Sequence, residues 1–302
     1  MNKLSIAGFT NLGYLLHSRD FDPITADLTG QTVVVTGATG GIGLETASTL
    51  SALNARVIAI GRSQDKLDSL GSHLREPYRA MRADLSLMSE VRRIAEDLNG
   101  SESVDVLVNN VGVLLPEYEE TDEGLEKSFA TDVAGHFLLT NLLLPGMVSV
   151  GSGRIVNISS GGMYSARANP KKLPMSEDRY NGTEAYAQAK RAQVILTEMW
   201  NGKLEGTGVS VNAMHPGWVE TAGVAFSLPT FNKVMKPFLR SVAQGADTIV
   251  WLAAGQTDQS GKFWFDRRPV ETHLSSSTKA SAETRQVIWK KLAEVTQSDL
   301  TL

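Results

Sequence analysis

The 302-residue sequence carries 29 Lys and Arg side chains against 33 Asp and Glu, which gives a net charge of −4 at pH 7. With 42% hydrophobic and 21% charged residues it has the composition of a globular protein, which excludes a mainly disordered chain. The near-neutral charge gives nucleic-acid binding little support, and the lack of cysteine excludes disulfide scaffolds, thiolate nucleophiles and Cys-ligated zinc.

Residues 1–29 are predicted to be an N-terminal arm. They have no continuous apolar segment and no cleavage site of a secretory signal, and no run in the chain approaches the roughly 18 apolar residues of a membrane-spanning helix. Residues 9–16 can form an amphipathic helix with Leu12, Leu15 and Leu16 on one face, which lies either on a membrane or partner chain, or on its own domain. We favour the second interpretation and expect a cytoplasmic protein, with peripheral membrane association as the alternative.

Strands and helices alternate along the rest of the chain. The predicted strands are runs of β-branched and aliphatic residues between turn formers: Thr32–Thr36, Arg56–Ile60, Val104–Asn109, Arg154–Ile158, Val209–Met214 and Lys262–Phe265. The predicted helices are Ile42–Leu53, Met88–Leu98, Glu184–Leu204, Val242–Ala254 and Ala282–Val295. Because such alternation implies right-handed parallel crossovers, we predict a single α/β domain of the doubly wound Rossmann type over residues 30–270. It would have a parallel sheet of about seven strands with helices on both faces, followed by a C-terminal helical extension over residues 271–302.

A glycine-rich turn joins the first predicted strand to the first predicted helix. Glycines let the backbone come close to a pyrophosphate, whose charge is then met by free N–H groups at the helix start. The spacing departs from G-x-G-x-x-G, and no Gly-Lys-Ser/Thr follows, so this is not a P-loop. We interpret the turn as a dinucleotide site rather than a turn without a ligand. The predicted cofactor contacts here are Gly37, Thr39, Gly40, Gly41, Ile42 and Gly43.

The end of the second predicted strand indicates which cofactor binds. An acidic residue about 20 residues beyond the glycine turn would bind the ribose hydroxyls of NAD. The sequence has Arg62 there, whose planar cation suits a 2′-phosphate and favours NADP over NAD, unless it is a solvated surface arginine. Asp84, followed by Leu85, would meet the adenine at the end of a third strand, although an N-cap is nearly as plausible for this aspartate.

Tyr186 and Lys190 are the candidate reactive pair, because they lie four residues apart and share a face of a predicted helix. That spacing alone is weak, but Ser159 and Ser160 follow a predicted strand, and ligands bind at the carboxyl ends of parallel strands. A phenol with a pKa of ~10 works as an acid or base near neutral pH only if a nearby cation stabilises its phenolate. Lys190 can supply that field, and a serine hydroxyl can orient the substrate oxygen while Tyr186 passes the proton.

Five ordered motifs, spanning about residues 30 to 265, resemble those of the short-chain dehydrogenase/reductase superfamily. They are Thr36-Gly37-x-x-x-Gly41-Ile42-Gly43, Asn109-Asn110-Val111-Gly112, Ser160, Tyr186-x-x-x-Lys190 and Pro216-Gly217. Further segments are similar to the retinol-dehydrogenase-like branch of that superfamily, and these extend into the C-terminal part of the chain: Ser159–Met163, Tyr186–Gln188, Met214–Trp218, Gln244–Thr248 and Asp266–Val270.

The resemblance implies an NADP(H)-dependent oxidoreductase that interconverts a carbonyl and an alcohol. Tyr186 would be the general acid in reduction and the base in oxidation. Lys190 would lower the pKa of that tyrosine and bind the nicotinamide ribose, and Ser160 would hold the substrate carbonyl. The remaining implied cofactor contacts are the glycine turn with the pyrophosphate, Asn110 and Gly112 beside the adenosine, and Pro216 with Thr221 near the carboxamide.

Asp132 departs from the family pattern, which has an asparagine whose backbone carbonyl helps to hold a water beside the lysine. If the backbone does this work, the proton relay survives. If the carboxylate is ionised near Lys190, it would hold that cation and alter the pKa of the tyrosine. Asp132 is therefore a catalytic candidate. It also motivates the alternative function, a non-catalytic dinucleotide-binding sensor or scaffold protein.

Two segments are expected to border the site. Residues 163–183, in the long interval between Ser160 and Tyr186, are predicted to be a surface loop beside its mouth, similar to the inserted loop of retinol-dehydrogenase-like members. Apolar side chains after residue 217 would form either a lid over a hydrophobic small-molecule substrate or an ordinary packed helix or subunit interface: Trp218, Phe226, Leu228, Phe231, Val234, Met235, Phe238 and Leu239. His136, His215 and His273 lack metal-ligand spacing, so no metal site is predicted, and the sequence leaves a homo-oligomer open.

Overall fold

The chain folds around one eight-stranded sheet, in a computed structural model that describes residues 6–227 and 229–300. The strand order is β3-β2-β1-β4-β5-β6-β7-β8; the first seven are parallel to their neighbours, and β8 runs antiparallel to β7. The strands are β1 Thr32–Thr36, β2 Arg56–Gly61, β3 Tyr78–Arg82, β4 Val106–Asn109, β5 Gly153–Ile158, β6 Val209–Met214, β7 Phe263–Phe265 and β8 Arg268–Val270. The predicted parallel α/β sheet is confirmed, with one antiparallel strand that the sequence prediction lacks.

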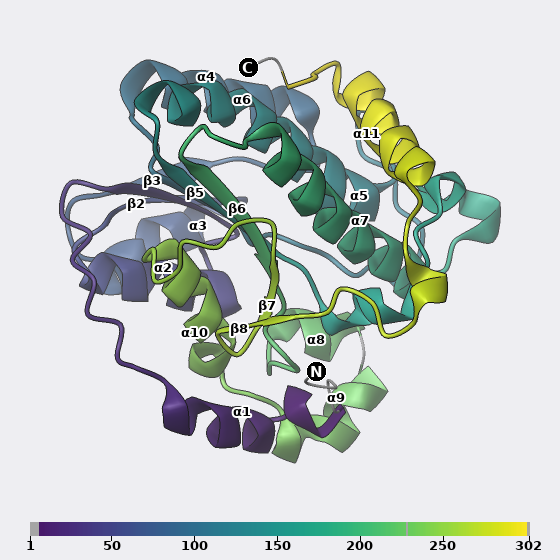
Figure 1. Ribbon diagram of the computed structural model, residues 1–302, viewed down its shortest axis with the longest axis horizontal. Helices are drawn as coiled ribbons and strands as arrows, with labels where there is room; N and C mark the ends of the chain where they lie inside the picture. The colour runs from purple at the N-terminus through teal and green to yellow at the C-terminus, as the bar shows by residue number, and fades with distance from the viewer. Residues whose placement is uncertain (1–5, 228, 301–302) are drawn as a thin grey trace.

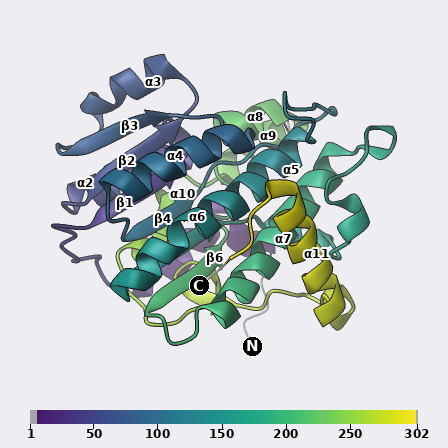
Figure 2. The ribbon, with the colours of Figure 1, turned by 90° about the horizontal axis from the view of Figure 1, so that it is seen from above.

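Helices cover both faces of the sheet (Figures 1 and 2). On one face lie α4 Met88–Ser101, α6 Gly135–Val150, α7 Gly182–Lys203 and α11 Ala282–Thr296. On the other lie α2 Gly41–Ala52, α3 Gln64–Asp68 and α10 Val242–Ala253. Because successive strand residues point to opposite faces, Val34 of β1 belongs to one core cluster while Val33 and Val35 belong to the other. Both faces of β1 are therefore buried away from water, which explains its uninterrupted run of valines.

Shorter elements connect this framework. The remaining α-helices are α1 Asn11–His17, α5 Lys127–Phe129, α8 Ala222–Ser227 and α9 Pro229–Met235, and a π-helical turn, Ala130–Ala134, joins α5 to α6. The 3₁₀ turns are Ile6–Phe9, Ser18–Asp20, Ser69–Ser72, Gly161–Ser165, Pro170–Lys172, Glu177–Arg179, Lys236–Phe238 and Ser276–Thr278.

The continuous helical stretch Lys127–Val150 corrects the expectation that nothing in the chain could span a membrane. By length and composition alone this stretch of 24 residues is apolar enough to do so, and 67% of its most apolar window is buried inside the protein. The stretch is a core helix of this domain, because α6 packs against α4 and β5, and a buried core helix can be as apolar as a membrane-spanning one. No helix was predicted over Gly135–Val150 because a helix buried around most of its circumference has no polar face and so no clear periodicity.

A buried ion pair fastens the N-terminal arm to the domain. Arg240 and Asp266 have side chains that are 1% and 3% exposed, and their two contacts measure 2.6 Å (Nη1–Oδ1) and 2.8 Å (Nη2–Oδ2). Arg240 also donates from Nη2 to the carbonyl of Gly8 at 2.7 Å and from Nε to that of Phe9 at 3.2 Å. The ring of Phe9 lies edge-on to Trp218. The arm therefore packs on its own domain.

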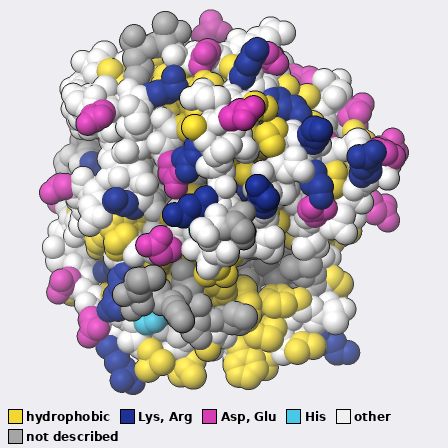
Figure 3. All heavy atoms as spheres, turned by 45° about the vertical axis from the view of Figure 1, so that its right-hand side comes forward, with side chains coloured by type: hydrophobic (Ala, Val, Ile, Leu, Met, Phe, Trp, Pro, Cys, Tyr) yellow, Lys and Arg dark blue, Asp and Glu magenta, His cyan; other side chains and the backbone are white. Residues whose placement is uncertain are grey.

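Part of the arm still faces outward. Leu12, Leu15 and Leu16 of α1 are more than half exposed, as are Phe226 and Val234 of α8 and α9. Asn11 donates to the carbonyl of Pro237, so α1 lies beside the segment that follows α9. Figure 3 shows apolar side chains gathered on the lower part of the molecule, where Figure 1 places α1, α8 and α9.

Substitution of Arg240 with methionine is predicted to lower the free energy of unfolding by about 3–5 kcal/mol, because it leaves the Asp266 carboxylate buried without its main partner. Urea denaturation measures this loss. Lys290→Met removes an exposed pair with Glu294 and should leave the midpoint unchanged. Equal stability of Arg240→Met and the wild type would show that the pair does not hold the arm.

Candidate active site

A cleft of about 640 Å³ lies at the carboxyl ends of the central strands. Its position follows from the strand order, because the chain winds outward in opposite directions from β1 and β4 and leaves a crevice between their loops. Its lining comes from the loops after β2, β4, β5 and β6 and from the helices α2, α7, α8 and α9. The lining residues are Ile42, Arg62, Asn110, Gly112–Leu115, Ile158–Ser160, Gly162, Ser165, Thr183, Tyr186, Ala187, Lys190, Pro216–Val219, Thr221, Phe226, Ser227 and Phe231.

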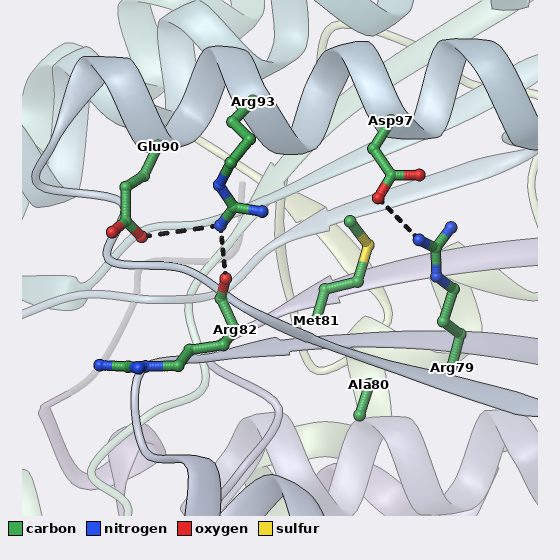
Figure 4. Close-up of a pocket in the computed structure, with 7 residues that line it drawn as sticks. All are labelled: Arg79, Ala80, Met81, Arg82, Glu90, Arg93 and Asp97. Atoms are coloured by element: carbon green, nitrogen blue, oxygen red, sulfur yellow. Dashed lines mark hydrogen bonds and ion pairs between the residues drawn. The ribbon is translucent and has the colours of Figure 1, made fainter.

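A second depression, of about 440 Å³, follows the outer edge of the sheet and is of a different kind (Figure 4). Figure 4 shows Glu90, Arg93 and Asp97 coming from α4 toward strand β3. Arg79 pairs with Asp97 at 2.7 Å, Arg93 with Glu90 at 3.9 Å, and Arg93 donates to the carbonyl of Arg82 at 2.7 Å. The two arginines thus bind carboxylates or a backbone carbonyl, and the cluster covers the exposed edge of strand β3.

Close packing explains two glycines of the glycine turn. A Cβ on Gly43 would overlap the carbonyl of Gly37, so α2 can start against the end of β1 only with glycine there. Gly37 itself has φ +68°, and its Cβ would lie 3.0 Å from Nδ2 of Asn110. Gly40 is different, because its backbone is extended and nothing lies within 4 Å of the place where its Cβ would be. Glycine at position 40 therefore leaves open space at the helix N-terminus.

Asn110 braces this turn. Its Nδ2 donates to the carbonyl of Thr36 at 2.8 Å, and its backbone N–H donates to Oγ1 of Thr36 at 2.9 Å. Asn110 lines the cleft, as the adenosine role requires, but its amide donors are directed at the end of β1. Gly112, expected beside the adenosine as well, lies at the reactive end, where its Cβ would meet Nζ of Lys190 at 3.0 Å and Oδ1 of Asp132 at 3.2 Å.

At the far end of the cleft, Arg62 projects from the end of β2 with its side chain 57% exposed. Nη1 lies 3.7 Å from Oδ2 of Asp84, an exposed pair of small energetic weight. Asp84 accepts the N–H of Ser86 at 2.9 Å and so caps the turn before α4, whose own N-cap is Leu87. The described lining of the cleft includes neither Asp84 nor Leu85, and the Leu85 side chain is buried in the core.

The reactive pair lies as the sequence predicts, on one face of α7. The side chain of Lys190 is 3% exposed, and its Nζ donates to the carbonyl of Ile158 at the end of β5, at 3.1 Å. The same Nζ lies 5.4 Å from the ring centroid of Tyr186. Ser159 fixes the helix to the strand, because its hydroxyl donates to the carbonyl of Lys190 at 2.8 Å. The bond to Ile158 therefore holds the ammonium beside the phenol, and the bond from Ser159 holds the helix that carries both residues against β5.

Ser160 and Tyr186 flank one point in the cleft. A Cβ on Gly162 would lie 3.5 Å from Oγ of Ser160 and 4.0 Å from Cε1 of Tyr186. Ser160 begins the 3₁₀ turn Gly161–Ser165, and its Oγ accepts the N–H of Gly162 at 3.1 Å. The O–H of Ser160 therefore remains available as a donor toward the cleft.

Asp132, in the π-helical turn, is fully buried behind Lys190. Its Oδ1 accepts the N–H of Val113 at 2.7 Å, and its Oδ2 lies 3.9 Å from Nζ of Lys190. Burial raises the pKa of Asp132 to about 6, although the Lys190 ammonium and the Val113 N–H each act to lower it. Its backbone carbonyl accepts Nε2 of Gln193 at 2.7 Å. The sequence left open whether the backbone carbonyl or the carboxylate of residue 132 acts on Lys190, and the geometry favours the carboxylate.

The segment after Pro216 forms one wall of the cleft. Gly217 has φ +80°, and its Cβ would contact the buried Arg240, so the Pro-Gly turn rests on the ion pair that holds the N-terminal arm. Thr221 lines the cleft, as do Trp218, Phe226 and Phe231 of the apolar set. Four other described members do not line it: Leu239 is buried, Val234 and Phe238 are exposed and Met235 is half-buried. Leu228 lies outside the described residues.

Residues 163–183 border the cleft through Ser165 and Thr183, as predicted. The segment is not simply a surface loop, however. It forms three 3₁₀ turns and buries Met163, Leu173 and Met175 in the protein interior. Spacing shows that residues have been inserted, but the apolar residues within the insert are too irregularly placed to predict which of them become buried.

Sequence reasoning missed Gln193 and the apolar residues Val113, Leu114 and Leu115. Gln193 lies three residues after Lys190, close to the helical repeat, and that spacing could have suggested a shared face. The three apolar residues directly follow the Asn109–Gly112 motif at the carboxyl end of β4, which is itself a signal for a ligand site.

The chain matches a known protein family. The family model described as short chain dehydrogenase matches residues 31–229. The chain is 35% identical over 298 residues to human dehydrogenase/reductase SDR family member 12, covering 95% of this chain and 92% of that protein. It is 33% identical over 258 residues to human retinol dehydrogenase 13, covering 80% and 78% of the two chains.

A solved structure is similar as well. It is described as an NAD(P) dependent gluconate 5-dehydrogenase from Beutenbergia cavernae with NADP bound at low occupancy. The TM-score is 0.64 with 27% sequence identity, covering 80% of this chain and 96% of that one.

The two glycines at positions 43 and 40 make a matched test of the glycine turn. Gly43→Ala is predicted to lower the free energy of unfolding by about 2 kcal/mol, because the new methyl group overlaps the carbonyl of Gly37. Gly40→Ala should stay within about 1 kcal/mol of the wild type, since its Cβ enters open space. Thermal or urea denaturation compares the two, and equal losses would contradict the close packing at Gly43.

Proposed function

We propose, since the chain belongs to the short-chain dehydrogenase/reductase family, that it is an oxidoreductase that uses NADP(H) to interconvert a carbonyl and an alcohol. One observation carries the proposal. Tyr186, Lys190 and Ser160 converge on the wall of a single cleft, which is also lined by Arg62 and by Ile42 at the start of α2, directly after the glycine turn.

The residues of the cleft fit a dinucleotide. The open space at Gly40 and the N-terminus of α2 together offer backbone N–H groups to a pyrophosphate. Lys190 uses one donor on the Ile158 carbonyl, so an ammonium with three donors has others to direct at ribose hydroxyls. A cleft of about 640 Å³ that extends from Arg62 to Ser160 suits an elongated ligand.

The mechanism divides the work among three side chains. A nicotinamide, when bound, supplies or accepts the hydride. The Tyr186 hydroxyl donates its proton to the substrate oxygen in reduction and takes it back in oxidation. Lys190, whose charge lies 5.4 Å from the phenol ring centroid, stabilises the phenolate that remains. Ser160 donates its O–H to the same substrate oxygen and so holds the carbonyl carbon toward the cofactor.

The cleft favours an apolar substrate. Leu114, Leu115, Trp218, Phe226 and Phe231 contribute hydrocarbon and aromatic surface to its lining. Polar groups that can fix the reacting oxygen, by contrast, cluster at Ser160 and Tyr186. This pattern, an apolar wall with a few convergent polar groups, suits a hydrophobic aldehyde, ketone or alcohol.

Arg62 favours NADP(H). It stands at the end of β2, where NAD-selective sites have an acid, and its guanidinium is half exposed toward the cleft. Its neighbour Asp84 is 3.7 Å away in a solvent-exposed pair, which a dianionic 2′-phosphate can displace at small cost. The similar solved structure that was reported with NADP is consistent with this choice.

Tyr186→Phe tests the chemistry. We expect turnover to fall by about 10²–10⁴-fold, because the proton donor is removed, while the Kd for NADPH changes by less than about threefold. Steady-state kinetics with apolar aldehydes and fluorescence titration measure the two quantities. Tyr118→Phe, whose hydroxyl contacts Glu120 away from the cleft lining, is the matched control. Unchanged turnover in Tyr186→Phe would contradict the role of Tyr186, whereas a wild type that binds NADPH without any turnover would favour the sensor or scaffold alternative.

Arg62→Ala tests the cofactor. Loss of a charge-assisted contact with the 2′-phosphate should raise the Kd for NADPH by about 10–100-fold and leave that for NADH nearly unchanged. Isothermal titration calorimetry compares the two nucleotides. Arg179→Ala, at an exposed position outside the described cleft lining, is the control. Tighter binding of NADH than of NADPH by the wild type would show that Arg62 does not select the cofactor.

A further inference from the structure

The carboxylate of Asp132 has one oxygen with an unusual environment. Oδ1 accepts the N–H of Val113, but Oδ2, with no exposed surface, has no hydrogen-bond partner among the described residues. The nearest charge to it is the ammonium of Lys190, 3.9 Å away. A buried carboxylate oxygen without a donor is costly, so its persistence at this position needs a reason.

The backbone of the same residue is committed elsewhere. Nε2 of Gln193 donates to the carbonyl of Asp132 and also lies 2.9 Å from Nδ1 of His136. Gln193 and His136 are both buried, so this contact fastens the π-helical turn to α7. The backbone carbonyl of residue 132 is therefore bonded to Gln193, while its carboxylate is the group that lies 3.9 Å from Nζ of Lys190.

Lys190 in turn depends on that carboxylate. Its side chain is 3% exposed, and the hydrogen bond to Ile158 satisfies one donor of a fully charged group. Moving an ammonium out of water costs free energy. One carbonyl offsets only part of this cost, whereas an opposite charge in the same buried space offsets more of it. Asp132 is the acid paired with Lys190 among the residues that the structure describes.

We propose that Asp132 is a positioning residue for Lys190: its ionised carboxylate is the buried counter-charge that keeps the lysine protonated and directed into the cleft. The proposal rests on the proposed function, because the ammonium matters through the phenolate that it stabilises. Asp132 is not itself among the residues that line the cleft, and it acts through Lys190, which is.

The surrounding charges agree with this role. From the turn before α5, Glu126 raises the pKa of Asp132, but Glu126 is itself held by the N–H groups of Ser128 and Phe129. From α6, His136 has a pKa lowered to about 3 by burial and the Lys190 charge, so it is neutral at working pH. Burial raises the pKa of Tyr180, and the charges of Glu126 and Asp132 add to this rise. On α11, which also packs on the turn, Arg285 pairs with Glu198 and Lys290 with Glu294.

These surroundings give the contact a pH dependence with a definite sign. Burial raises the pKa of Asp132 to about 6, so the carboxylate is protonated below that pH and ionised above it. Below about pH 6 the wild type therefore resembles a protein with an amide at position 132. Above it, only the wild type has the counter-charge, and a lysine without that charge gives up its proton at a lower pH.

Asp132→Asn tests the proposal, because asparagine keeps the acceptor for Val113 and loses only the charge. Values of kcat/KM for alcohol oxidation are measured from about pH 5.5 to about pH 9 for both proteins. We expect the ratio of wild type to variant to stay within about threefold near pH 6 and to rise to about tenfold or more near pH 9. A ratio that is the same at every pH, as a purely structural role would give, overturns the proposal. So does a variant that is the faster enzyme at high pH.

A second readout uses the cofactor-free protein. The ¹³Cε resonance of Lys190, identified by its absence in Lys190→Arg, reports the pH at which the ammonium loses its proton. In Asp132→Asn this midpoint should fall by about one pH unit or more relative to the wild type, and an unchanged midpoint overturns the proposal. If Asp132→Asn does not fold, Asp132→Ser removes the same charge and is measured instead.

Glu126→Gln is the matched control, because it neutralises another buried carboxylate near the same turn that does not pair with Lys190. Its activity ratio to the wild type should not vary with pH as that of Asp132→Asn does, and an equal pH dependence would overturn the proposal. The role of Asp132 and the proposed function can each fail without the other. A wild type that neither binds NADPH nor turns over refutes the proposed function while the NMR measurement still tests the pair. A wild type that turns over with a flat Asp132→Asn ratio refutes only the role of Asp132.

Discussion

The burial of a single ammonium group, that of Lys190, constrains the rest of the site. A charged group with a side chain 3% exposed requires a carbonyl at the end of β5, supplied by Ile158, and a nearby opposite charge, supplied by Asp132. It also requires space, and Gly112 provides it, since any Cβ there would press on Nζ. The parallel sheet brings these groups together because the carboxyl ends of β4 and β5 are adjacent. The geometry of the site is thus a consequence of strand order and of the need to stabilise one buried charge.

The same cleft is also tied to both ends of the chain. Arg240 lies against Gly217 in the Pro-Gly turn, pairs with Asp266 at the turn between β7 and β8, and binds the carbonyls of Gly8 and Phe9 in the N-terminal arm. The arm is therefore a structural part of the wall that carries the apolar lining. A change in the arm is expected to reach the substrate side of the cleft, whereas the glycine turn is held by a separate set of contacts around Thr36.

Much of the fold and of the site could be predicted from local patterns. The glycine turn, the Tyr186–Lys190 spacing and the valine-rich strand β1 are visible within a few residues, and the structure places them where the sequence indicates. The sequence does not delimit the edge strands β3 and β8, because two of the five residues of β3 are arginines and β8 has only three residues. The Arg240–Asp266 pair and the contact of Gln193 with residue 132 join segments distant in sequence, and no local pattern reveals such partners. Asn110 was assigned to the nucleotide because its motif suggested a ligand, while its amide braces Thr36.

The central claim is that this cleft moves a hydride between NADPH and a carbonyl carbon. The most direct measurement incubates the wild-type protein with NADPH deuterated at C4, separately on each face, and a panel of apolar aldehydes, followed by mass spectrometry of the alcohols. Transfer of one deuterium from one face only, to the carbinol carbon, is the predicted result. Formation of no alcohol from any aldehyde, or of alcohol without deuterium from either labelled cofactor, would contradict the claim.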